Sequence, residues 1–270
     1  MFVGFNLQGL DDKILSVYKG AGEANFNIQK KQVQKKLDCF VLDDGSLDGS
    51  ALQDDWFPEI KADIFLSHSH GDRKLIMAFA AMLEDKFGLT SFIDSCVWGY
   101  ADELLKKIDD KYCKNETGDT YNYNQRNFST SHVHMMLSSA LTKMMDKAEC
   151  LIFVNTPNSI TTRDAVEDKT KSPWIYNEIV ISQMLRKKKL VRSEEIKKSR
   201  EFEASRNKLN IVYDADLDHL TPLSTDDLLD WEKKYSENRI LFAFRNQPNH
   251  YPLDSLYEIK DLLKFKTYHK

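Results

Sequence analysis

The sequence predicts an α/β fold built on a parallel sheet. The main indication is the stretch Lys61–Glu103, which has the pattern of a strand, a helix and a second strand. Ala62–Ser67 is a short apolar run typical of a buried strand, and apolar residues then recur at helical spacing as far as Phe87. Thr90–Asp94 is the second short strand. Two strands joined by a helix need a crossover connection, which places them parallel in one sheet.

The other elements follow from periodicity and from helix start and stop signals. Gly88 stands where glycine commonly ends a helix, and Ser172 with Pro173 forms a typical helix start. Asp94–Asp102 and the polar stretch Lys114–Ser131 are expected to be loops. We expect further helices over Ala101–Tyr112, Val133–Lys147, Pro173–Lys189 and Pro252–Phe265, and further strands over Glu149–Thr156, Leu209–Asp214 and Ile240–Phe244.

Three regions are expected along the chain. Residues 1–60 are interpreted as an N-terminal extension that covers one side of the sheet, because they carry a Lys- and Gln-rich stretch at 25–37 and turn signals at 43–50. Residues 61–215 hold the strand and helix pattern of the main domain. Residues 216–270 form a C-terminal strand and helix segment that packs on this domain or completes it.

Composition and charge limit the classes of function. A chain of 270 residues that is 41% hydrophobic and 11% aromatic can form a sizeable core. Its formal net charge of -4 argues against nucleic acid as the main partner. No apolar run is long enough to span a membrane, and the N-terminus lacks the pattern of a signal peptide. The four cysteines are widely spaced, which predicts reduced thiols in a cytoplasmic protein.

Polar and aromatic side chains collect where ligands bind in open α/β sheets, at the carboxyl ends of the predicted strands. Ser67 and His68 end the first strand, and Asp94 ends the second. Trp98 and Tyr100 follow in the expected loop, where they could stack on a ring of a ligand, bury into a neighbouring subunit or pack over the sheet edge.

Two further candidate residues lie on the helix that is expected to begin at Pro173. Helical spacing places Trp174 and Glu178 one turn apart on the same face. By themselves they are also compatible with an exposed glutamate beside a tryptophan of the core.

Taken in this order, the motifs resemble those of the Toll/interleukin-1 receptor (TIR) domain family. The matching stretches are DIFLSHSHGD at 63–72, DSCVWGY at 94–100 and the Trp-x-x-x-Glu pattern at 174–178, and the resemblance covers about Lys61 to Arg186. It implies a flavodoxin-like α/β domain with N- and C-terminal additions. The similarity is closest to prokaryotic stand-alone TIR proteins of antiphage defence, such as the TIR component of Thoeris systems.

The resemblance also implies a reaction. Glu178 matches the catalytic glutamate of NAD-cleaving TIR domains, where it would bind the nicotinamide ribose and stabilise the oxocarbenium-like state. NAD would be the substrate, no cofactor would be needed, and the product would be ADP-ribose or a cyclic isomer sensed by a separate effector protein. Self-association through the TIR loops is also expected. The implied substrate-binding residues are Ser67, His68, Asp94, Trp98, Tyr100 and Trp174.

Two other functions remain open. One is a non-catalytic TIR scaffold that assembles through its aromatic loop. The other is a zinc hydrolase, because the pattern His68-x-His70-x-Asp72 also occurs in metallo-β-lactamase-fold enzymes, with His132 and His134 as possible further ligands. Against zinc, the last histidine of that signature is replaced by Arg73, and the glycine-bounded strands that should precede it are absent. We therefore expect no metal and regard His70 as exposed.

Overall fold

The computed structural model describes residues 1–10, 12–23, 37–116, 118–162, 168–170, 172–185, 213–244 and 250–263. Their central feature is a five-stranded sheet with the order β3-β2-β4-β1-β8, in which every neighbouring pair is parallel. The predicted α/β class is confirmed. The strands of this sheet are β1 (Val3–Gln8), β2 (Ile64–Ser67), β3 (Ser91–Ile93), β4 (Cys150–Asn155) and β8 (Thr221–Ser224).

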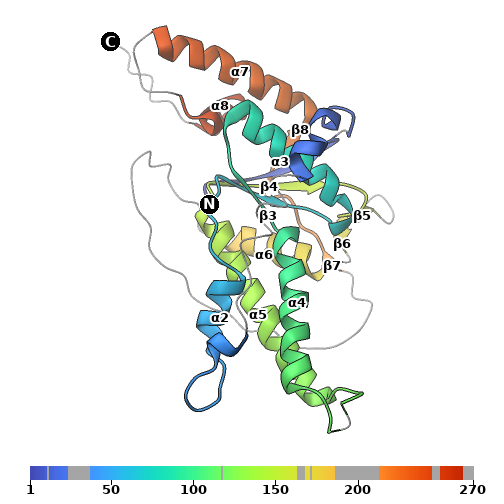
Figure 1. The fold of residues 1–270 in the computed structure, drawn as a ribbon. Helices are drawn as coiled ribbons and strands as arrows, with labels where there is room; N and C mark the ends of the chain where they lie inside the picture. Colours follow the sequence, from blue (N-terminus) through green and yellow to red (C-terminus); the bar gives the residue numbers. More distant parts are fainter. Residues whose placement is uncertain are drawn as a thin grey trace.

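Helices cover both faces of the sheet (Figure 1). One face carries α3 (Arg73–Phe87), α7 (Thr225–Phe244) and α8 (Pro252–Ile259), and the other carries α2 (Gly49–Trp56), α4 (Ser95–Tyr112), α5 (Tyr123–Lys147) and α6 (Pro173–Met184). Alternate strand residues feed the two cores. Phe65 packs in the core beneath α4, α5 and α6, whereas Ile64 and Leu66 pack in the core beneath α3 and α8. This three-layer arrangement is flavodoxin-like.

The remaining described elements are short. The 3-10 helices are η1 (Ser16–Tyr18), η2 (Leu37–Phe40) and η3 (His70–Asp72). A separate antiparallel sheet has the order β5-β6-β7, formed by β5 (Thr161–Thr162), β6 (Asp168–Thr170) and β7 (Tyr213–Asp214). No helix in the described part of the chain is long and apolar enough to cross a membrane.

The N-terminal residues correct the prediction of a separate extension over residues 1–60. Val3–Gln8 is an inner strand, paired with β4 along its whole length and with β8 on its other side. Every second residue of β1 has an apolar side chain, and these side chains pack in the same core as α3 and α8. On the other face, Gly4 leaves room for the Leu220 side chain, because a Cβ at Gly4 would lie 2.5 Å from it. The order β3-β2-β4 matches the first three places of the flavodoxin order 2-1-3-4-5, and β1 takes the fourth.

Several expected elements differ from the structure in type or in their boundaries. Ile240–Phe244 forms the exposed end of α7 and not a strand. Helix α5 begins at Tyr123, within the expected loop, because Asn122 caps it by accepting a hydrogen bond from the Gln125 amide. The first turns of that helix are exposed, so they need no apolar pattern. Helix α4 begins at Ser95, within the second expected loop, and α6 ends at Met184.

The elements with the strongest local signals are confirmed. The first crossover helix ends at Gly88, which has a left-handed conformation with φ of 66°. Ser172 caps α6 by accepting a hydrogen bond from the Ile175 amide at 3.3 Å. Of the C-terminal helix expected over Pro252–Phe265, α8 occupies Pro252–Ile259. Expected structure at 25–36, 186–189, 209–212 and 264–265 lies outside the described residues.

Candidate functional site

The candidate site lies at the carboxyl edge of the sheet, where β2 and β4 are neighbours. The chain passes from β2 to β3 on one side of β2 and then returns to β4 on its other side. Open parallel sheets bind ligands at such a switch in strand direction. The structure brings together here the buried polar residues Ser67, His68, Asp94, Ser95 and Glu178.

Glu178 is joined to the end of β2. The Ser67 hydroxyl donates a hydrogen bond to Glu178 Oε2 at 2.5 Å, and the glutamate is only 1% exposed. Helix α6 holds it there because Ile175 and Ile179, on the same side of the helix, pack into the core. The interpretation of Glu178 as an exposed helix residue is therefore wrong, and its carboxyl group belongs to a buried polar cluster.

His68 and Asp94 form the second half of this cluster. His68 Nδ1 lies 2.7 Å from Asp94 Oδ1, and both side chains are fully buried. The other ring nitrogen, Nε2, lies 3.0 Å from the Ser95 hydroxyl. Asp94 also accepts a hydrogen bond from the Ser95 amide at the start of α4. The pair thus ties the loop after β2 to the first residue of α4.

Burial sets the protonation of Glu178. It raises the pKa of this carboxyl well above the ordinary value of 4.5, and the negative charge of Asp94 raises it further, whereas the Ser67 hydrogen bond acts in the opposite direction. Glu178 Oε1 and Asp94 Oδ2 are both buried without a hydrogen-bond partner among the described residues. Protonation of Glu178 would avoid the repulsion between two negative charges, because two buried carboxyl groups close together do not both ionise readily.

The pKa shift of His68 favours the charged form of its side chain, whereas that of Glu178 favours the uncharged form. Burial lowers the pKa of its imidazole, but the charge of Asp94 and the hydrogen bond to it outweigh that effect and leave the pKa above its ordinary value of 6.5.

The predicted aromatic residues do not line a loop. Tyr100 lies in α4 and is buried, with 7% of its surface exposed, which corrects the expected role in stacking on a ligand. Trp98 also falls in α4, but its side chain lies outside the described residues. Trp174 is partly buried, and its ring meets that of His134 edge to face with 5.6 Å between centroids.

A second polar cluster lies at this edge, and its residues were not among the predicted site residues. Asp72 accepts hydrogen bonds from the Thr156 hydroxyl at 2.5 Å and from the Asn158 side-chain amide at 2.7 Å. These contacts fasten η3 to the turn that follows β4. The signal available in the sequence is the run of polar residues after the β4 strand, which parallel pairing brings next to the end of β2.

The histidines of the possible zinc motif do not converge. His68 is buried and paired with Asp94, His70 is exposed on η3, and Asp72 is occupied by the two hydrogen bonds just described. In the part of the chain that the structure describes, no group of three or more His, Cys, Asp or Glu side chains could hold a metal ion. Cys39, Cys113 and Cys150 form no disulfide.

Comparison with known proteins assigns no family to this geometry. No protein-family model, no curated protein and no solved structure matches the chain.

Proposed function

We propose that this chain is a TIR-type enzyme that cleaves the N-glycosidic bond of NAD, with Glu178 as the catalytic carboxylate. The observation that supports this best is the position of Glu178. A carboxyl group is held at the switch point of a parallel sheet, against Ser67 and beside the His68–Asp94 pair. Three sequence motifs that are far apart in the chain meet at this one place.

The reaction breaks the bond between the nicotinamide nitrogen and the ribose carbon. The bonding electrons leave with nicotinamide, which loses its positive charge, and positive charge develops on the ribose. An ionised Glu178 beside that carbon stabilises this charge by electrostatics. Water then forms a bond to the ribose carbon and loses a proton, which gives ADP-ribose. Alternatively, a ring nitrogen of adenine forms this bond with its lone pair and the base then loses a proton, which gives a cyclic isomer.

The raised pKa of Glu178 is compatible with a carboxyl group that ionises when NAD binds. The pyridinium ring of NAD carries a positive charge, and an opposite charge nearby favours ionisation of a carboxyl group. Binding of NAD would therefore remove the proton that burial keeps on Glu178. Ser67 would hold the ionised carboxylate in place, because its hydroxyl already donates to Oε2.

The site is closed in this structure. With Glu178 1% exposed, NAD reaches the carboxylate only after the surrounding segments move. Self-association, or contact with an activating partner, is the step that we expect to open it. In a defence system the product would then signal to a separate effector protein.

The same burial favours one alternative, a non-catalytic TIR scaffold in which Glu178 only stabilises the core. Nicotinamide release distinguishes the two functions. The purified chain is incubated with NAD over a range of protein concentrations, and nicotinamide and ADP-ribose isomers are separated by chromatography. Release that rises more than proportionally with protein concentration supports the enzyme and its activation by assembly. No release at any concentration, with or without an activating partner, supports the scaffold.

A further inference from the structure

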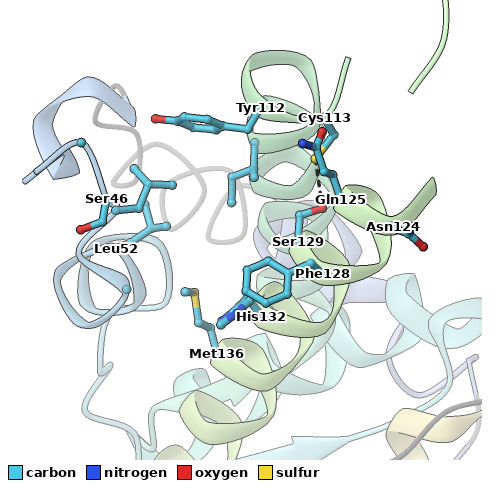
Figure 2. Close-up of a pocket in the computed structure, with 14 residues that line it drawn as sticks. Ser46, Leu52, Tyr112, Cys113, Asn124, Gln125, Phe128, Ser129, His132 and Met136 are labelled. Atoms are coloured by element: carbon cyan, nitrogen blue, oxygen red, sulfur yellow. Dashed lines mark hydrogen bonds between the residues drawn. The ribbon is translucent and has the colours of Figure 1, made fainter. Parts of the chain in front are cut away.

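A cavity of about 850 Å³ lies on the side of the molecule formed by α2, the end of α4 and the first half of α5 (Figure 2). It shares no residue with the cluster around Glu178. Its lining consists of Gly45, Ser46, Leu47, Gly49, Leu52, Ile108, Tyr112, Cys113, Asn124, Gln125, Phe128, Ser129, His132 and Met136. The volume lies within the range of about 300–1,000 Å³ typical of small-molecule sites.

The lining carries no Asp, Glu, Lys or Arg, although these residues make up 30% of the chain. Leu52 of α2 faces α4 and α5 across the cavity, and Ile108 and Met136 add apolar surface. Burying an ionic group against such a wall is unfavourable, because no opposite charge replaces the lost water. The lining therefore selects an uncharged ligand.

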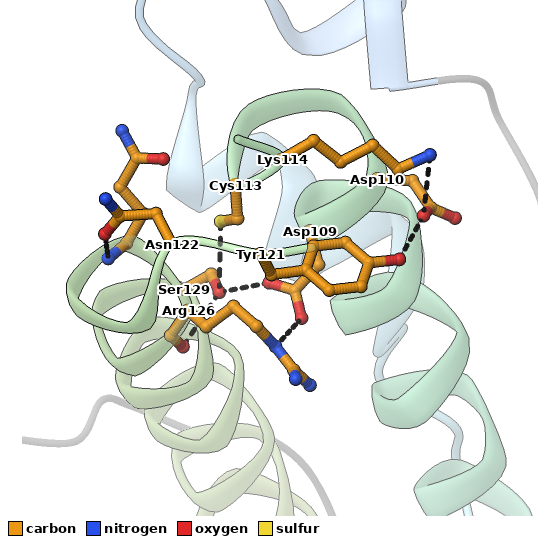
Figure 3. A network of polar contacts seen from close by, with 9 residues as sticks. Asp109, Asp110, Cys113, Lys114, Tyr121, Asn122, Arg126 and Ser129 are labelled. Carbon is orange, nitrogen blue, oxygen red and sulfur yellow. Dashed lines mark hydrogen bonds and ion pairs between the residues drawn. The ribbon is translucent and has the colours of Figure 1, made fainter. Parts of the chain in front are cut away.

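Asp109 lies next to two lining residues, Cys113 and Ser129, and its carboxylate is paired with other groups (Figure 3). Asp109 is 3% exposed, and it accepts hydrogen bonds from the Ser129 hydroxyl at 2.5 Å and from Arg126 Nε at 2.9 Å. Its charge is thus paired with Arg126 and is not available to a ligand. Ser129 lines the cavity, as does Cys113, which contacts Ser129, whereas Asp109 and Arg126 do not.

Cys113 does not make the cavity a covalent site. Burial raises the pKa of its thiol above the ordinary value of 9.0, so the sulfur stays protonated near neutral pH. The thiol contacts the Ser129 hydroxyl, with 3.8 Å between sulfur and oxygen. A protonated thiol held in this way is a weak nucleophile, and the ligand is therefore expected to bind without a covalent bond.

Aromatic side chains suggest the shape of the ligand. Phe128 is 68% exposed, although it stands at the cavity, and its ring meets that of His132 with 4.4 Å between centroids. Tyr112 contributes a second aromatic ring from α4 (Figure 2). A flat ring placed here would cover the apolar surface of Phe128, and aromatic pairs add to the free energy gained by burial. The amide of Gln125 can donate or accept one hydrogen bond.

We infer that this cavity is a binding site for an uncharged, aromatic small molecule, held without a covalent bond. The inference does not depend on the proposed NAD cleavage.

The test uses N-phenyl-1-naphthylamine, an uncharged aromatic dye whose fluorescence increases in apolar surroundings. Titration of the full chain should show saturable binding of one dye per chain. Phe128→Ala should weaken binding on the order of tenfold, because it removes one aromatic wall. The matched control is Phe244→Ala on α7, another phenylalanine at an exposed helix position, which should leave the dissociation constant unchanged.

A second variant fills the space directly. Met136→Trp should abolish dye binding while the circular dichroism spectrum and melting temperature stay close to those of the wild type. If this variant does not fold, the comparison of Phe128→Ala with Phe244→Ala still tests whether the cavity binds the dye. Both substitutions are at exposed positions and should leave the fold intact. Absence of saturable binding to the wild type, or unchanged affinity in Phe128→Ala, overturns the site. Equal or tighter binding of the anionic dye 1-anilinonaphthalene-8-sulfonate overturns the assignment of an uncharged ligand.

Discussion

The Ser67 hydroxyl donates a hydrogen bond to the carboxyl group of Glu178, 111 residues further along the chain. This contact joins the last residue of β2 to α6 and places Glu178 beside Asp94 in the interior. In this position Glu178 is buried, and burial together with the charge of Asp94 raises its pKa.

Replacement of Glu178 by glutamine should abolish most of the proposed activity. Glutamine has the same size but carries no negative charge, so the developing charge on the ribose loses its main electrostatic partner. Removal of one such contact typically lowers the rate by about 10²–10³. Nicotinamide release under saturating NAD measures the effect. Glu237→Gln, at an exposed position of α7, is the control and should keep the wild-type rate. A wild-type rate in Glu178→Gln would show that another group carries the chemistry.

The same substitution should make stability less sensitive to pH. The pKa of Glu178 is higher in the folded state than in the unfolded state. The contribution of Glu178 to the free energy of unfolding is therefore fully present below about pH 4.5 and is lost as pH rises through the folded-state pKa. In that window the folded state binds more protons than the unfolded state, and the free energy of unfolding falls. Glu178→Gln has no such proton to lose.

Urea denaturation between pH 4.5 and pH 8 measures this difference. Relative to the wild type, Glu178→Gln should gain stability steadily as pH rises, and the difference should level off above the folded-state pKa. Groups that titrate in the same way in both proteins cancel. A difference that stays constant across the range, or that changes in the opposite direction, would mean that Glu178 is ionised in the folded protein.

Removal of His68 from the His68–Asp94 pair should lower the free energy of unfolding more than removal of Asp94. His68→Ala leaves the buried Asp94 without its positive partner and beside Glu178, and loss of one member of a buried ion pair typically costs about 3–5 kcal/mol. Asp94→Ala should cost less, because the imidazole of His68 can lose its proton and be buried without a charge.

A double-mutant cycle isolates the pair. The free energies of unfolding of the wild type, both single variants and the double variant are measured by urea denaturation at pH 7. The double variant should lose clearly less than the sum of the two single losses. Additivity within about 0.5 kcal/mol would indicate that the two side chains are not coupled.

Purified protein should contain no stoichiometric zinc. His68 is held in the interior by Asp94, while His70 is exposed on η3, so the two histidines do not face one site. Elemental analysis measures the metal content, and EDTA should leave both the melting temperature and nicotinamide release unchanged. Two zinc ions per chain would favour the hydrolase reading of His68, His70 and Asp72 and count against the TIR-type mechanism.

Local patterns in the sequence were sufficient for the elements nearest the site. The strands that became β2, β3 and β4, the helix ending at Gly88 and the helix starting after Ser172 were all predicted, because burial pattern and capping depend on residues close together in the chain. The order of those strands also predicted that Ser67, His68 and Asp94 would share one edge of the sheet, which their contacts confirm.

Elements without a strong local pattern were misread. Ile240–Phe244 has the composition of a strand, but it continues the helix that starts at Thr225. Tyr123–Ser131 is polar, yet it is helical because Asn122 caps it and because an exposed helix needs no apolar face. The first segment takes the conformation of the helix that it continues, and the second takes the conformation that its N-cap starts.

The tertiary structure alone decided the place of β1 and the state of Glu178. β1 lies between two strands that come about 150 and 220 residues later in the chain, so its pairing partners leave no signal near it in the sequence. The raised pKa of Glu178 arises from burial and from Asp94, which the fold brings close to it from the N-cap position of α4. The sequence by itself determined which chemical groups are available. The packing of distant segments determined which of them are buried together, and this burial shifts the pKa of Glu178.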